Sequence, residues 1–174
     1  MHRSITRALL AVAVVLCGWS PAAADITAFI GATTDPGTRT TKGVSVGAGL
    51  VIVGFEFEYA EAGGDDENEP ACLPGGSGEC KPSLRTGMVN VLLQTPRGIA
   101  PVQIYGTVGG GLYRERYEAT DETDTGFGSN VGGGVKFNLV GPLRIRLDYR
   151  IFRLTGDTVY KTPKRFYAGA NLTF

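Results

Sequence analysis

Apolar and polar residues alternate along much of this chain. In the segment 143–154, every second residue is apolar: Leu143, Ile145, Leu147, Tyr149 and Ile151. The residues between them are charged: Arg144, Arg146, Asp148 and Arg150. Because successive side chains of a strand point to opposite faces, this period predicts strands with one apolar and one polar face. The 3.6-residue period of an amphipathic helix is not found.

Eight segments carry this pattern and are separated by turn-forming residues. Their expected bounds are 25–34, 43–52, 54–62, 83–94, 101–115, 126–138, 143–154 and 164–174. Between the second and third segments we expect a tight turn near Val53-Gly54, because glycine takes positive φ without strain. The predicted fold class is all-β: a transmembrane, antiparallel, up-and-down β-barrel of about eight strands.

The connections between these segments alternate in length, which favours a membrane barrel. Short connections are expected at 53–54, 95–100 and 138–142, and longer ones at 35–42, 62–82, 118–125 and 155–163. Outer-membrane barrels have short periplasmic turns and long outer loops. The longest connection carries an acidic run, 65–69, and a cysteine pair.

The polar faces hold charges of opposite sign, and this distinguishes a membrane barrel from a soluble one. A soluble, lipocalin-like barrel fills its interior with apolar groups, whereas a membrane barrel turns them toward lipid. In a narrow lumen, buried charges must be paired. We therefore predict a charge network in the lumen, made of Glu56, Glu58, Arg144, Arg146, Asp148 and Arg150.

The first residues have the features of a signal peptide. Arg3 and Arg7 precede an apolar run over 8–17, which is too short to span a bilayer. Small residues at Ala22 and Ala24 satisfy the A-x-A cleavage rule. We expect cleavage before Asp25, so that residues 1–24 are the signal peptide and 25–174 are the barrel domain.

The chain ends on an alternating, aromatic segment, FYAGANLTF over 166–174. With the signal peptide and the strand rhythm, this ending resembles the small eight-stranded outer-membrane barrels of the OmpA, OmpX and opacity-protein type. The resemblance covers the mature chain. It implies residence in the outer membrane, contact with its lipid, and a terminal strand that the barrel-assembly machinery reads. Phe166, Leu172 and Phe174 would carry that assembly signal.

The titratable residues give no support for catalysis or for cofactor binding. The only histidine is His2, inside the expected signal peptide, so the serines have no histidine base to activate them. With 17 basic and 17 acidic residues, the chain lacks the excess of positive charge expected of a nucleic-acid-binding protein. Cys72 and Cys80 are the only cysteines of the mature chain, and in an exported protein they favour a disulfide over a metal site. We predict no enzyme activity, no cofactor and no metal.

The predicted function is structural or surface-interacting, similar to an adhesin. The barrel is the scaffold of a monomer, and its long outer loops contact an extracellular ligand. Two alternatives remain at this stage: a porin-like channel for small solutes, and a soluble periplasmic binding barrel of the lipocalin type. Against the channel, an eight-stranded barrel is only wide enough for side chains to fill its interior.

Overall fold

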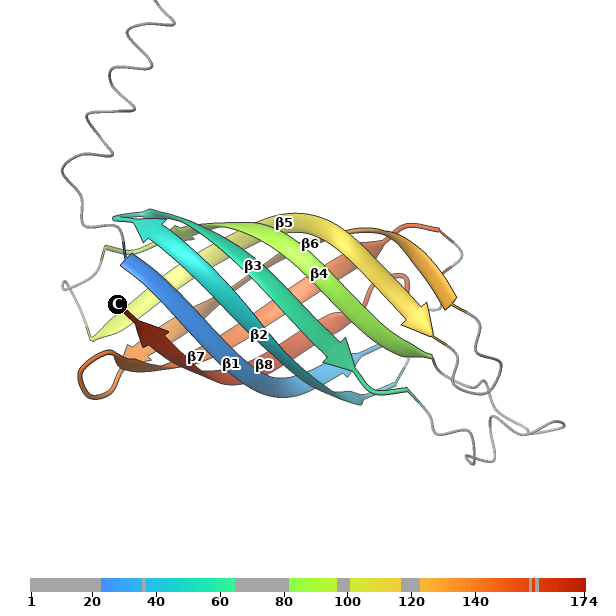
Figure 1. Ribbon diagram of the computed structural model, residues 1–174, viewed down its shortest axis with the longest axis horizontal. Helices are drawn as coiled ribbons and strands as arrows, with labels where there is room; N and C mark the ends of the chain where they lie inside the picture. The colour runs from blue at the N-terminus through green and yellow to red at the C-terminus, as the bar shows by residue number, and fades with distance from the viewer. Residues whose placement is uncertain are drawn as a thin grey trace, which may run out of the picture.

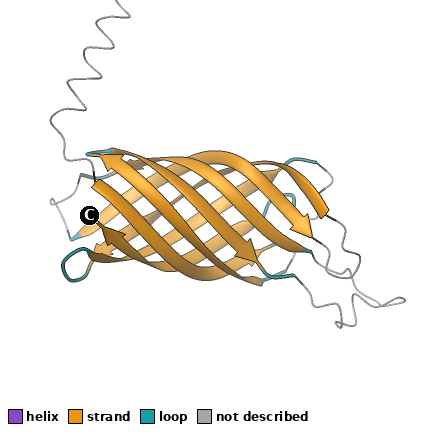
Figure 2. Cartoon of the chain, in the orientation of Figure 1, coloured by secondary structure: helices purple, strands orange, loops and turns teal. Residues whose placement is uncertain are grey.

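Eight antiparallel strands close into one barrel, because β1 is hydrogen-bonded to both β2 and β8 (Figure 1). The computed structural model describes residues 23–35, 37–64, 82–96, 101–116, 123–156, 158 and 160–174. The strands are β1 (Ala23–Thr34), β2 (Arg39–Leu50), β3 (Val53–Ala62), β4 (Ser83–Gln94), β5 (Val102–Arg116), β6 (Thr123–Asn138), β7 (Leu143–Leu154) and β8 (Lys164–Thr173). The described residues hold strands and loops (Figure 2), with no helix long and apolar enough to cross a membrane. The predicted fold class is confirmed.

Each strand pairs with its neighbours in the chain, so successive connections lie at alternate ends of the barrel. The two ends therefore carry different sets of connections. The connections β2–β3, β4–β5 and β6–β7 lie at the end that carries the C-terminus (Figure 1), and we call it the short-turn end. The opposite end, where β3–β4, β5–β6 and β7–β8 connect, is called the loop end. Because outer-membrane barrels place their short turns in the periplasm, the loop end faces outward from the cell.

The predicted turn at Val53-Gly54 is wrong by two residues. The strands turn at Val51-Ile52, where Val51 has φ 35°, and Gly54 lies inside β3 opposite Gly49. A Cβ on Gly49 would come within 2.9 Å of the amide nitrogen of Gln94 in the lumen. Gly49 therefore makes room for the side chain of Gln94, and neither glycine forms the turn.

The first outer connection is shorter than predicted. β2 begins at Arg39 and pairs with β1 from Thr33↔Arg39 onward, so the connection spans 35–38 and not 35–42. Thr41 faces the lumen, where its hydroxyl lies 2.7 Å from the hydroxyl of Thr33. These threonines continue the strand alternation, and the simple contrast of long and short connections does not hold for this hairpin.

The two faces of the wall are inverted relative to a soluble protein. Large apolar side chains such as Ile30, Val89 and Phe127 are more than half exposed on the outside. Two aromatic residues near the short-turn end, Phe55 and Phe137, are also outward and exposed. The largest fully covered side chains include three arginines. Apolar residues outside and charge inside are what a barrel surrounded by lipid requires.

Candidate functional site

The centre of the lumen holds a charge network of three acidic and three basic side chains. Its members come from β3, β7 and β8, and each is at most 3% exposed: Glu56, Glu58, Arg146, Asp148, Arg150 and Arg165. Inward positions alternate with lipid-facing ones on these strands, so each strand sends its polar face to the same space. We call this set the central network.

Glu56 lies between two arginines of β7. Arg146 donates to both carboxylate oxygens of Glu56 through its two Nη atoms, and Arg150 Nη2 donates to Oε1 at 2.7 Å. The hydroxyl of Ser45 adds a hydrogen bond of 3.1 Å to Oε2. The carboxylate is thus satisfied on both oxygens, as a buried charge must be.

Asp148 lies between the same two arginines on the β7 side. Arg146 Nη2 and Arg150 Nε each donate to it at 2.9 Å. The hydroxyl of Tyr105 also donates to Asp148 and accepts from Arg146 Nε at 2.7 Å. The aspartate therefore holds both guanidinium groups in the orientation that meets Glu56 across the lumen.

Glu58 lies nearer the loop end and binds a second level of cations. Arg165 Nη1 donates to Glu58 Oε1 at 3.1 Å, and Arg150 Nη1 lies 3.1 Å from Oε2. The hydroxyl of Tyr167 donates to the same carboxylate at 3.2 Å. Arg165 also donates to Thr86 from Nη2 at 3.1 Å. The six charges therefore form one connected array that crosses the lumen.

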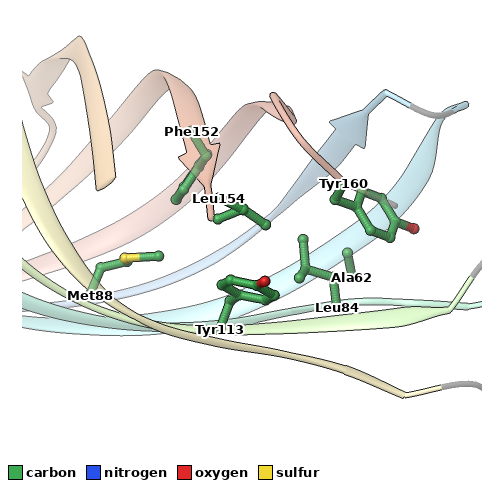
Figure 3. Close-up of a cluster of buried hydrophobic side chains, with 7 residues drawn as sticks. All are labelled: Ala62, Leu84, Met88, Tyr113, Phe152, Leu154 and Tyr160. Carbon is green, nitrogen blue, oxygen red and sulfur yellow. The ribbon is translucent and has the colours of Figure 1, made fainter. Parts of the chain in front are cut away.

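Toward the loop end, apolar side chains fill the lumen. This loop-end cluster consists of Ala62, Leu84, Met88, Tyr113, Phe152, Leu154 and Tyr160, shown in Figure 3. The guanidinium carbon of Arg165 lies 4.5 Å from the centre of the Phe152 ring, so the cluster directly contacts the central network. The expectation of a polar lumen holds only in part at this end, where apolar side chains lie beside the buried Glu115 and Thr158.

The connection from β7 to β8 contributes Tyr160 to the loop-end cluster. Tyr160 is fully buried, and its hydroxyl donates to the carbonyl of Pro82 at 3.0 Å. Its backbone N–H donates to Glu115 Oε1 at 3.1 Å, and Thr158 donates to the same carboxylate. An outer connection is thereby fastened into the barrel mouth. The period-two alternation of β7 places Phe152 and Leu154 on the same face as Arg146 and Arg150. These two apolar residues at inward positions indicated an apolar layer in the lumen, and the sequence analysis did not use them.

The short-turn end of the lumen has a separate ion pair. Lys136 Nζ donates to Asp25 Oδ2 at 2.7 Å, and both residues are buried. Beside them is a cavity of about 10 Å³ whose lining includes Asp25, Glu56, Gln94 and Lys136. Such a volume holds about one water molecule. Neutral polar side chains also lie inside the barrel: Asn130 donates to Asn90 at 2.8 Å, and Asn171 donates to Thr27 at 2.9 Å.

Five of the six predicted lumen charges lie in the central network, whereas Arg144 lies toward the short-turn end. There its Nη1 lies 3.3 Å from Oε1 of Gln103, to which it donates. Sequence reasoning missed Arg165, although the β8 alternation had put it on the polar face. It also missed the pair Lys136–Asp25.

The residues of the predicted assembly signal lie outside the lumen. Phe166 and Leu172 of β8 and the terminal Phe174 are exposed on the outer wall. Cys72 and Cys80, like the acidic run 65–69, lie outside the described residues. The expected cleavage point falls inside β1, since Ala23 and Ala24 pair with Gly49 and Ala48.

The central carboxylates are held by arginines, and within the described ranges no group of three or more histidine, cysteine, aspartate or glutamate residues could hold a metal ion. Each of Glu56, Glu58 and Asp148 is within 3.1 Å of at least one guanidinium nitrogen. The arrangement can neutralise charge and close the lumen.

Solved structures share this fold at low sequence identity, and three of them are described here. The N-terminal β-barrel domain of Pseudomonas aeruginosa OprF has a TM-score of 0.64 at 12% identity, covering 87% of this chain and 97% of that chain. Ail, the attachment invasion locus protein of Yersinia pestis, was solved in complex with the heparin analogue sucrose octasulfate. It has a TM-score of 0.55 at 14% identity, covering 88% of this chain and 97% of that chain. The outer membrane enzyme PagL has a TM-score of 0.51 at 10% identity, covering 85% of this chain and 98% of that chain. Identities this low show the fold alone.

The sequence itself matches a family model over nearly its whole length. The model of the outer membrane protein beta-barrel domain matches residues 9–174. No curated protein matches the chain. The resemblance to small eight-stranded outer-membrane barrels is therefore confirmed for the fold and the location. The chain belongs to the outer membrane protein beta-barrel domain family and is a β-barrel protein of the outer membrane.

Proposed function

We propose that this protein is a closed, non-enzymatic scaffold of the outer membrane, whose outer connections make surface contacts of the adhesin type. The observation that carries the proposal is the filled lumen. Arg146, Arg150 and Arg165 are fully covered, and the loop-end cluster lies directly above them. A barrel whose lumen is filled by the central network and by the loop-end cluster supports the outer connections. The surface that contacts other molecules then lies at the loop end.

The filled lumen speaks against the channel alternative. A solute would have to separate Glu56 and Glu58 from their arginines and also displace Tyr160 from the barrel mouth. Breaking a buried ion pair by removing one partner costs about 3–5 kcal/mol. Passage would require several such contacts to open at once, so we propose that the wild-type barrel conducts no ions at rest.

The covered position of the central carboxylates supports a non-enzymatic role. Because PagL is an enzyme with the same fold, the fold alone does not decide this point. The chain has one histidine, His2, and a general base must reach the proton that it removes. Glu56 and Asp148 are covered and held by arginines, so neither meets a substrate from the solvent or from the membrane.

Conductance across a planar bilayer, combined with a cell-surface binding assay, tests the proposal. We expect no stable conductance steps from the purified protein. We also expect cells that display it to bind to surfaces or host matrix through the connections 63–82 and 117–122. Ohmic steps in the wild-type protein would overturn the closed scaffold. Binding that persists after both connections are shortened would overturn the loop assignment.

Three further parts of the proposal concern maturation and assembly. We propose cleavage before Asp25, a disulfide between Cys72 and Cys80, and recognition of Phe166, Leu172 and Phe174 by the assembly machinery. The mature protein would be a monomer. N-terminal sequencing and thiol titration of the native exported protein test the first two. For the third, deletion of Phe174 should lower the yield of assembled barrel, and an unchanged yield would contradict it.

A further inference from the structure

Two turns at the short-turn end have apolar, exposed tips. Val51-Ile52 joins β2 to β3, and residues 139–142, which begin with Leu139-Val140, join β6 to β7. Each of these four side chains is at least 50% exposed, and Val140 is 81% exposed. Turns that project into water are usually built from glycine, proline, asparagine, aspartate and serine. We call Val51, Ile52, Leu139 and Val140 the apolar tips.

The backbone at Val51 gives an independent reason to assign a role to these side chains. Val51 has φ 35°, in the left-handed region, where a β-branched residue is an outlier. Asn-Gly or Asp-Gly would form a two-residue hairpin turn without this strain. Among the described residues, the other non-glycine residue with positive φ is Asp35, a residue type that tolerates this conformation. Because such strain clusters at functional sites, it indicates that an apolar side chain is needed at this turn.

Backbone hydrogen bonds fasten both turns to the next strand of the sheet. The carbonyl of Ile52 accepts from the N–H of Gln94 in β4 at 2.8 Å, and the carbonyl of Pro142 accepts from the N–H of Thr173 in β8 at 3.0 Å. In a lipid environment, polar backbone groups must be paired within the protein because little water is present to bind them. The pairing of these two carbonyls therefore suits a turn that enters lipid.

The uncharged part of the outer wall, which we call the apolar belt, extends down to these tips. On β2, Lys42 is the last charged residue before the turn, and Val51 lies nine residues further. On β7, ten residues separate the outward Arg153 from Leu143, and the outward positions between them are uncharged. A strand that rises about 3.3 Å per residue and is tilted by about 40° gains about 2.5 Å of height per residue. The belt is then about 23–25 Å tall, which matches the apolar band of about 25 Å in outer-membrane barrels.

The two turns lie on opposite sides of the barrel. In a closed ring of eight strands, the β2–β3 turn and the β6–β7 turn are four strands apart (Figure 1). A bilayer surrounds the barrel and therefore meets both turns at one level, whereas a compact protein partner would have to cover the whole end of the barrel. The position of the apolar tips thus favours lipid as the partner of both.

We propose that the apolar tips are inserted into the headgroup region of the periplasmic leaflet. Val51 and Ile52 on one side of the barrel, and Leu139 and Val140 on the other, contact lipid and not periplasmic water. The tips and the apolar belt then form one continuous lipid-facing surface, and exposed apolar surface of this kind marks membrane contact. The tips fix the depth at which the barrel stands in the membrane.

Tryptophan fluorescence of the protein in phosphatidylcholine vesicles tests the proposal. The one tryptophan of the chain, Trp19, lies in the expected signal peptide, so a tryptophan introduced into the mature protein is the only reporter. Ile52→Trp and Val140→Trp each place it at one tip. Bromine atoms near the headgroup end of the lipid chains should quench both reporters several-fold more than bromine atoms at mid-chain. Iodide on both sides of the membrane should quench them several-fold less than a reporter in water. Folding of each variant is checked by the different gel migration of unheated and boiled samples.

Two reference variants calibrate the depth of the tips. Val89 is 59% exposed in the apolar belt of β4, so Val89→Trp should be quenched most strongly by mid-chain bromine. Lys161 is exposed in the β7–β8 connection, so Lys161→Trp should be quenched by iodide. The second reference also shows whether an indole reaches the interface through its own preference for that region.

The comparison of tips and references decides the proposal. If Ile52→Trp and Val140→Trp respond to iodide as Lys161→Trp does, the short-turn end stands in water and the proposal is wrong. That result would leave the tips to a periplasmic protein. Quenching of one tip by lipid and of the other by iodide would mean that no single membrane level meets both turns, and it would also overturn the proposal.

Discussion

The lumen is filled in two different ways within one barrel. In the central network, three carboxylates and three guanidinium groups form ion pairs and hydrogen bonds in fixed directions. In the loop-end cluster, side chains such as Met88, Phe152 and Tyr160 fill space without directed pairing, apart from the tyrosine hydroxyls. The strands β3 and β7 contribute side chains to both.

The difference shows that a membrane barrel needs a closed interior and not a uniformly polar one. Lipid fixes the chemistry of the outer wall, where apolar side chains are required. Inside, charge is stable where it is paired, and hydrocarbon is stable where it is packed. Arg165 joins the two layers, because it pairs with Glu58 on one side and lies over Phe152 on the other.

The largest expected effect is a cavity in the loop-end cluster. Phe152→Ala should lower the free energy of unfolding by about 3–5 kcal/mol, because the side chain is packed on all sides and Arg165 loses its ring contact. Reversible unfolding by urea in lipid vesicles measures it. Phe127→Ala is the control, since Phe127 is 57% exposed on the outer wall and lipid can fill the space. Equal losses in both variants would contradict a packed interior.

The second largest expected loss of stability comes from a charge on the outer wall. Leu147 faces outward on β7 opposite Val135 and Ala168, so Leu147→Arg places a cation in the apolar belt. Such a cation lowers the free energy of unfolding by about 2–4 kcal/mol near the bilayer middle and by about 0–1 kcal/mol near an interface. Leu139→Arg, in the β6–β7 turn, should therefore be nearly neutral in the same assay. A neutral Leu147→Arg would place this face away from lipid.

The smallest effect concerns the connection fastened into the barrel mouth. Tyr160→Phe keeps the ring and removes the hydrogen bond to the Pro82 carbonyl, so stability should fall by about 0.5–1.5 kcal/mol. Limited proteolysis should cut the β7–β8 connection faster. Tyr59→Phe, at an exposed outer position, should change neither stability nor cleavage. Unaltered cleavage of Tyr160→Phe would show that the hydroxyl does not hold this connection.

Period-two alternation identified most of the strands and the inward polar face of β3, β7 and β8, while strand length was needed to separate β2 from β3. It placed Glu56, Glu58, Arg146 and Arg150 on inward faces because each lies between outward apolar residues. Alternation gives no register, so the position of the turn at Val51-Ile52 and the early start of β2 at Arg39 were not found. Glycine also misled the turn prediction, since Gly54 lies inside β3 and does not have a positive φ.

Contacts across the lumen could not be predicted from one sequence. Arg165 on β8 reaches Glu58 on β3, and Asp25 on β1 reaches Lys136 on β6. These strands are not neighbours in the sheet, so their pairing depends on how the closed barrel staggers its strands. The loop-end cluster was missed for a related reason: an apolar residue on an inward face, such as Leu84, resembles a break in the alternation until the opposite wall is known.

The central claim is that Glu56 and Glu58 of β3 are sealed inside the barrel, and one matched pair of variants tests it most directly. Glu58 and Glu61 lie on the same strand, and each pairs with an arginine at 3.1 Å, but Glu58 is fully buried and the side chain of Glu61 is 31% exposed. Glu58→Ala should lower the free energy of unfolding in vesicles by about 3–5 kcal/mol, and Glu61→Ala by about 0–1 kcal/mol. A small, equal effect of both substitutions would mean that the lumen is open to water, and the account of a sealed barrel would be wrong.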